Sequence, residues 1–234
     1  MTGTGIGIGT GIGTGERRVG LPTGELRERY LRAQLAGDRR EAVRLVLEEG
    51  VDRGASVVEL QSDVIQAAQD EIGRLWQLNL VTIAQEHMAT AISQLALSAL
   101  FQHAPARKAH GKKIAIACVE GEQHDLPARL VADYLELDGF EVRYFGANVP
   151  QDELGAMIRD ESPDVIGLSV TMSFNMPALR EAISRLRTIT TAPILVGGHA
   201  VELSRQAAAA LGVELAGKRP DELCAAVRRL AGVA

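Results

Sequence analysis

A histidine and a nearby carboxylate follow a short apolar run in the second half of the chain. The run Lys113–Val119 leads into Glu120-Gly121-Glu122-Gln123-His124-Asp125. A neutral imidazole suits a first-row transition metal ion. A carboxylate two residues away can accept the other ring N–H, which fixes the tautomer and makes the ring a better ligand. These residue types predict a metal ligand at His124, oriented by Glu122.

Two later segments also have polar or glycine residues at the end of an apolar run. Ser169 and Thr171 belong to one of them, and Gly197-Gly198 follows Ile194–Val196. Each segment alone also fits an ordinary role: His124 at a helix start, the hydroxyls as helix caps, the glycines as a strand-to-helix turn. Their joint order and spacing favours one shared site.

Short apolar runs alternate with amphipathic segments from Lys113 onward. The expected strands are Lys113–Val119, Glu141–Phe145, Val165–Ser169, Ile194–Val196 and Val213–Leu215, and the expected helices are Leu126–Leu137, Asp152–Asp160, Pro177–Thr188, Val201–Ala210 and Pro220–Ala231. This alternation predicts an α/β domain with a doubly wound, five-stranded parallel sheet of the flavodoxin-like or Rossmann-like kind. Ligands of such sheets bind outside the carboxyl ends of the strands. The three polar segments should therefore meet at one edge.

The stretch from Thr23 to Gln102 has the three- and four-residue apolar spacing of helices. Four helices fit it, approximately Glu25–Leu35, Arg39–Arg53, Val57–Leu78 and Val81–Gln102, and their short connections predict a four-helix bundle. The expected organisation is a disordered Gly/Thr-rich tail over residues 1–22, the bundle over 23–103 and the α/β domain over 111–234.

A second group of candidate residues lies where the third and fourth expected helices meet. Trp76, the only tryptophan, is separated by nine residues from Glu86-His87. The ordinary interpretation is that Trp76 belongs to the bundle core and Glu86 is a solvated charge. The alternative is a ligand pocket formed by the indole and the carboxylate across the helix–helix turn.

The composition is that of a globular protein and disfavours several classes. The chain has 234 residues, is 46% hydrophobic and 24% charged, and carries a net charge of −5. A negative chain has no electrostatic reason to bind a phosphate backbone, and no apolar run reaches the roughly 20 residues of a membrane span. Two cysteines without zinc or disulfide spacing fit a reducing compartment. We expect a cytoplasmic protein that binds neither nucleic acid nor a membrane.

The α/β half resembles the cobalamin-binding motif shared by methionine synthase, corrinoid methyl carriers and cobalamin mutases. That motif has an acid, one residue, His, two residues and Gly, then Ser-x-Leu, then Gly-Gly; this chain has Glu122-x-His124-x-x-Pro127, Ser169-x-Thr171 and Gly197-Gly198. The departures are Glu122 for Asp, Pro127 for Gly and Thr171 for Leu.

The resemblance implies that His124 is the lower axial ligand of cobalt. It also implies that the nucleotide tail of the cobalamin enters the sheet through a slot lined by Ser169, Thr171, Gly197 and Gly198. Gln123 and Asp125, on either side of His124, complete the expected lower-face residues.

Trp76 and Glu86-His87, followed by Met88-Ala89-Thr90, resemble the upper-face signature of adenosylcobalamin-dependent photoreceptors, best known as light-released repressors of carotenoid genes. The resemblance implies that Trp76 and Glu86 pack around the adenosyl group. It departs at Gln77, where the family has a histidine that takes the upper cobalt site after light breaks the Co–C bond; His87 is then the candidate for that role. The Gly/Thr tract stands where the repressors have a DNA-binding helical domain.

Stand-alone sensors of this architecture include the photocobilins, which hold a bilin beside the cobalamin. The resemblance implies a second chromophore such as biliverdin, held non-covalently because Cys118 lies in an expected buried strand and Cys224 on a distal helix. The Ala- and Leu-rich faces of the bundle predict a homo-oligomer, and a sensor implies a downstream protein partner.

Three functions are compatible with these residues. The first is a light sensor with adenosylcobalamin as chromophore, which rests on Trp76 and Glu86-His87. The second is a corrinoid methyl-carrier protein for a partner methyltransferase, which the lower-face motif alone would suggest. The third is a cobalamin store or chaperone. No acid–base or nucleophile constellation occurs apart from the cofactor, so we expect no independent enzyme activity.

Overall fold

The structure is a computed structural model that describes residues 21–105 and 107–233. The expected disordered tail therefore lies outside the described residues, apart from its last two. Leu21 packs against the hydrophobic core and Pro22 is the N-cap of the first helix, so these two residues adjoin the bundle.

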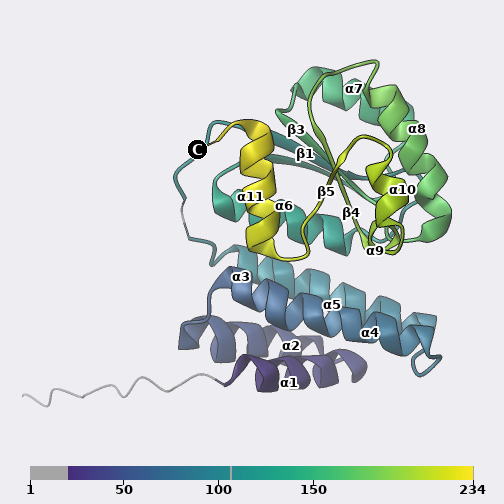
Figure 1. The fold of residues 1–234 in the computed structure, drawn as a ribbon. Coiled ribbons are helices and arrows are strands. Elements are labelled where there is room, and N and C mark those ends of the chain that lie inside the picture. Colours follow the sequence, from purple (N-terminus) through teal and green to yellow (C-terminus); the bar gives the residue numbers. More distant parts are fainter. Residues whose placement is uncertain (1–20, 106, 234) are drawn as a thin grey trace, which may run out of the picture.

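The N-terminal half is helical, with four helical segments at the expected positions (Figure 1). The first is α1 (Thr23–Leu35). The second runs from α2 (Arg39–Arg44) through η1 (Leu45–Gly50) into η2 (Val51–Arg53), and the third from α3 (Val57–Glu59) through η3 (Leu60–Gln66) into α4 (Ala67–Gln77). The fourth is α5 (Ile83–Phe101). Side chains of Asp38, Ser56 and Thr82 cap three of the helix starts, as short polar residues at such positions commonly do.

The second and third segments were expected to be plain α-helices, and this expectation is wrong in one respect. Both contain a π-helical stretch, η1 and η3. The two stretches meet at Gly50, where a side-chain Cβ would lie 2.7 Å from Leu60 Cδ2. Apolar periodicity cannot reveal such a turn, because the apolar residues still lie on one face of the segment.

The C-terminal half contains a five-stranded parallel sheet in the order β2-β1-β3-β4-β5, which confirms the flavodoxin-like expectation. The strands are β1 (Lys113–Cys118), β2 (Glu141–Gly146), β3 (Val165–Ser169), β4 (Ile194–Gly197) and β5 (Glu214–Leu215). The strand order reverses between β1 and β3, whose last residues, Cys118 and Ser169, are paired. In such sheets the binding crevice opens where the order reverses.

Helices cover both faces of this sheet (Figure 1). One face carries α6 (Leu126–Asp138) and α11 (Pro220–Ala231); the other carries α7 (Gln151–Glu161), η4 (Ser173–Asn175) with α8 (Met176–Leu186), α9 (His199–Leu203) and α10 (Arg205–Ala209). The single helix expected over Val201–Ala210 is wrong, because Ser204 has φ −126° and ψ 34° and divides it into α9 and α10.

The two halves pack together through α6 of the α/β domain. One cluster of buried apolar side chains runs from the bundle through α6 to the sheet. Polar contacts reinforce this interface: Gln61 Nε2 donates to Asp133 Oδ2 at 2.8 Å, and Tyr134 Oη donates to Gln66 Oε1 at 3.2 Å. The bundle is thereby held against the α/β domain (Figure 1). None of the described helices combines the length and apolar character needed to cross a membrane.

Candidate functional site

The loop between β1 and α6 holds His124 in one orientation. His124 Nδ1 lies 2.6 Å from Glu122 Oε1, and the backbone N–H of His124 donates to the same oxygen at 3.0 Å. Pro127 occupies the first turn of α6, where a proline is well tolerated because its missing N–H would have no helical partner. With Nδ1 directed at the carboxylate, Nε2 is the nitrogen left for a metal, and the side chain is 41% exposed.

Glu122 is the buried centre of this loop. Its side chain has no exposed surface. Besides His124, the carboxylate accepts from the backbone N–H groups of Thr171 and Met172, both at 2.9 Å, and from Asn175 Nδ2 at 3.0 Å. A carboxylate with so many donors ties the loop after β1 to the loop after β3.

These hydrogen bonds decide the ionisation of the pair. Burial alone would raise the pKa of Glu122, but donors from His124, Met172 and Asn175 outweigh it and hold that pKa at about 2. The hydrogen bond that His124 donates to Glu122 in turn raises the pKa of His124, against the opposing effect of desolvation. The pair therefore has the form of an imidazole oriented by a carboxylate, which is the usual arrangement of a metal-ligating histidine.

Asp125 links the same loop to the bundle. Its carboxylate accepts from Gln94 Nε2 of α5 at 3.1 Å and from Tyr144 Oη of β2 at 3.1 Å. The neighbouring Gln123 is exposed. Asp125 was expected to touch the cofactor; its contacts connect α5 to the residue that follows His124.

Ser169, Thr171, Gly197 and Gly198 gather at the carboxyl edge of β3 and β4, as expected. Gly198 has φ +106°, and a Cβ there would lie 2.2 Å from Val170 O, so its glycine is required by close backbone packing. Gly197 pairs with Ser169 across the two strands. Thr171 Oγ1 is buried and has no hydrogen-bond partner among the described residues.

The residues at this edge fit a cobalamin. An outward Nε2 suits cobalt, and an unpartnered buried hydroxyl beside small strand-end residues suits a polar group entering the sheet. His124 would bind the metal, and Glu122 would orient the imidazole of His124. Ser169 and Thr171 would contact the nucleotide tail.

The bundle residues lie at the α4–α5 hairpin. Trp76, at the end of α4, is 36% exposed, so it is no core tryptophan. Gln77 is exposed beside it. Glu86 is partly buried, with Oε2 lying 2.5 Å from His87 Nδ1, while the His87 side chain is 70% exposed. The interpretation of Trp76 as bundle core is therefore wrong.

The hydrogen bond between Gln94 of α5 and Asp125 brings the bundle to the loop that carries His124. The Glu86 carboxylate is among the charges that raise the pKa of His124. The bundle and the loop after β1 are therefore in contact.

Sequence reasoning missed Asn175, Gln94 and Gln69. Asn175 is buried in η4 and donates to Glu122; its position four residues after Thr171 was available, but no rule of spacing marks an asparagine there. Gln94 and Gln69 lie within helices whose periodicity says nothing about which amides meet a partner.

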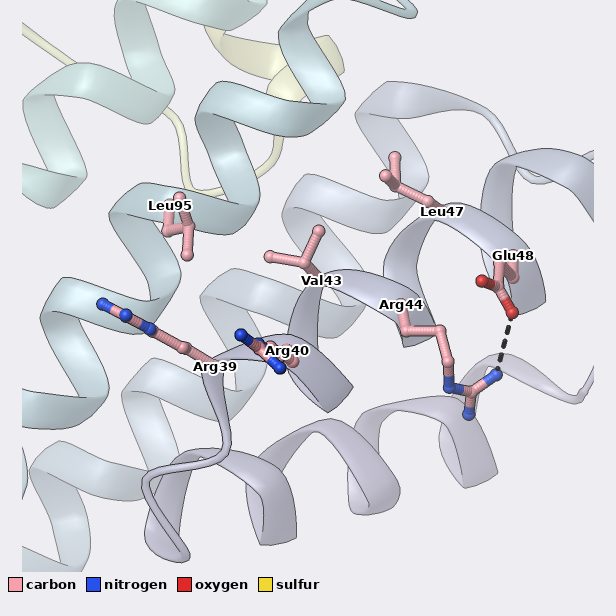
Figure 2. Close-up of a pocket in the computed structure, with 7 residues that line it drawn as sticks. All are labelled: Arg39, Arg40, Val43, Arg44, Leu47, Glu48 and Leu95. Carbon is pink, nitrogen blue, oxygen red and sulfur yellow. Dashed lines mark hydrogen bonds and ion pairs between the residues drawn. The ribbon is translucent and has the colours of Figure 1, made fainter.

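An open groove of about 420 Å³ lies elsewhere on the bundle, between α2 and α5 (Figure 2). It is lined by Arg39, Arg40, Val43, Arg44, Leu47, Glu48 and Leu95. It shares no residue with the His124 cluster, so the two are separate features of the molecule.

Comparison with known proteins agrees with this chemistry. Two family models, each described as a B12-binding domain, match residues 26–101 and 112–226. The chain therefore carries B12-binding domains in both halves, and a cobalamin or other corrinoid cofactor is supported.

Curated relatives fall into two groups. The chain is 31% identical over 133 residues to the HTH-type transcriptional repressor CarH of Myxococcus xanthus, covering 56% of this chain and 44% of the relative. It is 29% identical over 125 residues to dimethylamine corrinoid protein 1 of Methanosarcina acetivorans, covering 53% of this chain and 59% of the relative. The chain thus spans about half the length of these relatives.

The fold has a close counterpart among solved structures. The monomethylamine corrinoid protein of Methanosarcina barkeri superposes with a TM-score of 0.79 over 89% of this chain and 100% of its own, at 17% identity. At that identity the likeness establishes the architecture, a helical N-terminal region followed by a Rossmann-like sheet.

Proposed function

We propose that this pair of B12-binding domains is a light sensor whose chromophore is adenosylcobalamin. His124 would bind cobalt from below, and Trp76 and Glu86 would enclose the adenosyl group from above. The observation that carries the proposal is the exposed indole at the end of α4, together with the partly buried carboxylate of Glu86 near the start of α5. A ligand between the two halves would cover both.

The residue types suit an adenosyl group better than a methyl group. An indole can stack on a purine, and a carboxylate accepts hydrogen bonds from ribose hydroxyls. A methyl group offers neither a ring nor a donor. Trp76 and the partly buried Glu86 therefore have a use only if the upper ligand is large and polar.

Bound adenosylcobalamin would supply a cobalt–carbon bond that visible light breaks. The chain's residues would read the loss of the adenosyl group. Trp76 and Glu86 would lose their ligand, while the Gln94–Asp125 contact ties α5 to the loop that carries His124. A change in the hairpin could thus reach the interface between the two halves.

His87 completes the proposal for the illuminated state. Since Gln77 replaces the family's histidine and an amide is a poor cobalt ligand, His87 would occupy the upper site. Its Nδ1 is paired with Glu86, which leaves an exposed Nε2. A non-covalent bilin belongs to the proposal only through the family resemblance. The homo-oligomer is proposed from the Ala- and Leu-rich faces of the bundle, and the downstream protein partner from the sensor function.

A corrinoid methyl carrier is the second candidate. It is favoured by the dimethylamine corrinoid relative and by the fold shared with the monomethylamine corrinoid protein. Under this function the His124 loop would act in the same way. Trp76 and Glu86 would have no effect on the upper ligand.

The test compares protein loaded with adenosylcobalamin and with methylcobalamin, before and after green light. Both cofactors are light-sensitive, so the readout must include the protein as well as the absorption spectrum. A sensor predicts an irreversible spectral change together with altered hydrogen exchange in α4 and α5, in the adenosylcobalamin sample. Photolysis that leaves hydrogen exchange identical in both samples would support the carrier.

A further inference from the structure

A continuous row of polar side chains crosses the core of the bundle and ends at Glu86. Tyr30, Gln34 and Ser93 have no exposed surface. Burying polar groups in a helical core is costly unless every donor finds an acceptor. The row therefore needs a reason beyond the packing of four helices. Its members, from α1 to the hairpin, are Tyr30, Gln34, Ser93, Gln69, Thr90 and Glu86.

The row has a fixed direction at the α1 end. Gln34 Nε2 donates to the backbone carbonyl of Ala89 at 3.1 Å and to Ser93 Oγ at 2.9 Å. A backbone carbonyl can only accept, so the amide of Gln34 must present its donor side here. Ser93 Oγ accepts this hydrogen bond from Gln34. Its own hydroxyl proton donates a hydrogen bond to Gln69 Oε1 at 3.1 Å.

The direction continues to Glu86. With its oxygen occupied by Ser93, Gln69 turns its Nε2 toward α5, where it donates to Thr90 Oγ1 at 2.7 Å and to Glu86 Oε1 at 3.4 Å. Thr90 Oγ1 in turn donates a hydrogen bond to Glu86 Oε1 at 2.8 Å. Every donor along the row thus points the same way, and the last acceptor is the Glu86 carboxylate.

One oxygen of the Glu86 carboxylate is therefore held by hydrogen bonds from other bundle residues. Oε1 accepts from Thr90 and Gln69, while Oε2 lies 2.5 Å from His87 Nδ1. A flip of the Gln69 amide would bring its oxygen against Thr90 Oγ1 and Glu86 Oε1. The Ser93 hydroxyl would then lose Gln69 Oε1 as its acceptor. The row leaves the carboxylate one orientation.

We propose that Gln69, acting with Thr90, is a positioning residue that fixes the Glu86 carboxylate and so sets the preference for an adenosyl upper ligand. The inference rests on the proposed function, since it assumes that Glu86 meets the adenosyl group. Gln69 itself contacts no cofactor; it acts through Glu86. The row explains why a bundle that could be apolar keeps two amides and three hydroxyls along this line of contacts.

The experiment is a double-mutant cycle on cofactor affinity. Dissociation constants for adenosylcobalamin and methylcobalamin are measured for the wild type, Gln69→Met, Glu86→Ala and the double variant. Methionine matches glutamine in length but donates nothing. Gln69→Met should weaken adenosylcobalamin binding about tenfold, the order expected for hydrogen bonds to a charged group, and change methylcobalamin binding less than twofold. In the Glu86→Ala background the same change should cost less than twofold.

Two companions keep the outcome decisive. Gln66→Met is the control, because Gln66 bonds Tyr134 of the α/β domain and lies outside the row; it should lower both affinities equally or not at all. Thr90→Val removes the hydroxyl link at nearly constant volume and should reproduce Gln69→Met, which covers the case where Gln69→Met does not fold.

The results separate the two levels of the account. If Glu86→Ala weakens both cofactors equally, the proposed function of the upper face is wrong. If Glu86→Ala is selective for adenosylcobalamin but Gln69→Met and Thr90→Val are not, or if their effects persist without Glu86, the positioning role is overturned.

Discussion

The His124 loop and the α4–α5 hairpin are built in opposite ways. The loop is held by one fully buried carboxylate that accepts from two loops at once, so its histidine is fixed. The hairpin exposes Trp76 and His87, and only Glu86 is anchored, through amides and hydroxyls in the bundle core. The two regions should therefore differ in how strongly each responds to strain or disorder in the other.

This difference suggests a division of roles. A rigid lower site suits a metal ligand that must be ready in every state of the protein, because preorganisation lowers the cost of binding. An upper site of exposed side chains can change when its ligand is lost. Under this account the α/β half binds corrinoids in general, and the bundle decides which upper ligand is accepted.

The largest effect should come from His124→Ala. The variant removes the imidazole that Glu122 orients at the sheet edge, so the dark protein loaded with adenosylcobalamin should show a base-off spectrum. Its affinity should fall further than for any change to the supporting residues. His103→Ala, an exposed histidine after α5, is the control. A dark spectrum and affinity equal to the wild type would refute the ligand assignment.

A smaller effect is expected from Glu122→Gln, which keeps the shape of the side chain. An amide has one accepting oxygen, whereas Glu122 accepts from His124, Thr171, Met172 and Asn175. At least one donor then loses its partner, and corrinoid affinity should drop roughly 10- to 100-fold, as for other residues that orient a metal ligand. Glu120→Gln, on the exposed side of the loop, should leave affinity unchanged. Equal behaviour of the two variants would mean that Glu122 does not orient His124.

The interface between the two regions should give the smallest effect, and a pH-dependent one. Burial raises the pKa of Asp133 from 3.8 to about 6 beside Gln61, whose Oε1 has no partner among the described residues. Because the folded protein holds this proton more tightly than the unfolded chain, the free energy of unfolding should fall as pH rises from about 4 to 6 and stay lower above that.

Asp133→Asn removes this penalty and can pair with the Gln61 amide. The variant should be more stable than the wild type at pH 8, by at most about 3 kcal/mol for a shift of this size, and the gain should vanish near pH 4. Denaturant unfolding at both pH values measures it, with Asp160→Asn on the exposed side of α7 as control. A gain of the same size at both pH values would show that Asp133 ionises normally.

Much of the fold could be predicted because its signals are local. Strand-length apolar runs fixed the positions of β1 to β5, and β3 matches its expected bounds from Val165 to Ser169. The π-helical stretches could not be predicted from local spacing. At Gly50 a larger side chain would collide with Leu60, and this contact with a residue of another helical segment is not visible in the apolar pattern. The break at Ser204 was missed because the residues around it have the apolar spacing of one continuous helix.

The candidate site was predictable to the extent that its residues follow strands. Glu122 and His124 were found because an acid and a histidine two residues apart after a strand have a chemical meaning. Asn175, Gln94 and Gln69 were not, because an amide acquires its role only from a partner distant in sequence, such as Glu122 for Asn175. Spacing alone also left Trp76 between core and pocket; its exposure decided against the core.

Whether the bundle selects an adenosyl upper ligand can be measured as the ratio of the dissociation constants for adenosylcobalamin and methylcobalamin in Trp76→Ala. Stacking of an aromatic side chain on a base contributes about 1–3 kcal/mol, or roughly 5- to 150-fold in affinity. The account predicts a loss in that range for adenosylcobalamin, with methylcobalamin changed less than twofold. Phe101→Ala, an exposed aromatic at the far end of α5, should change neither. Equal losses for both cofactors in Trp76→Ala would contradict the account and favour the methyl carrier.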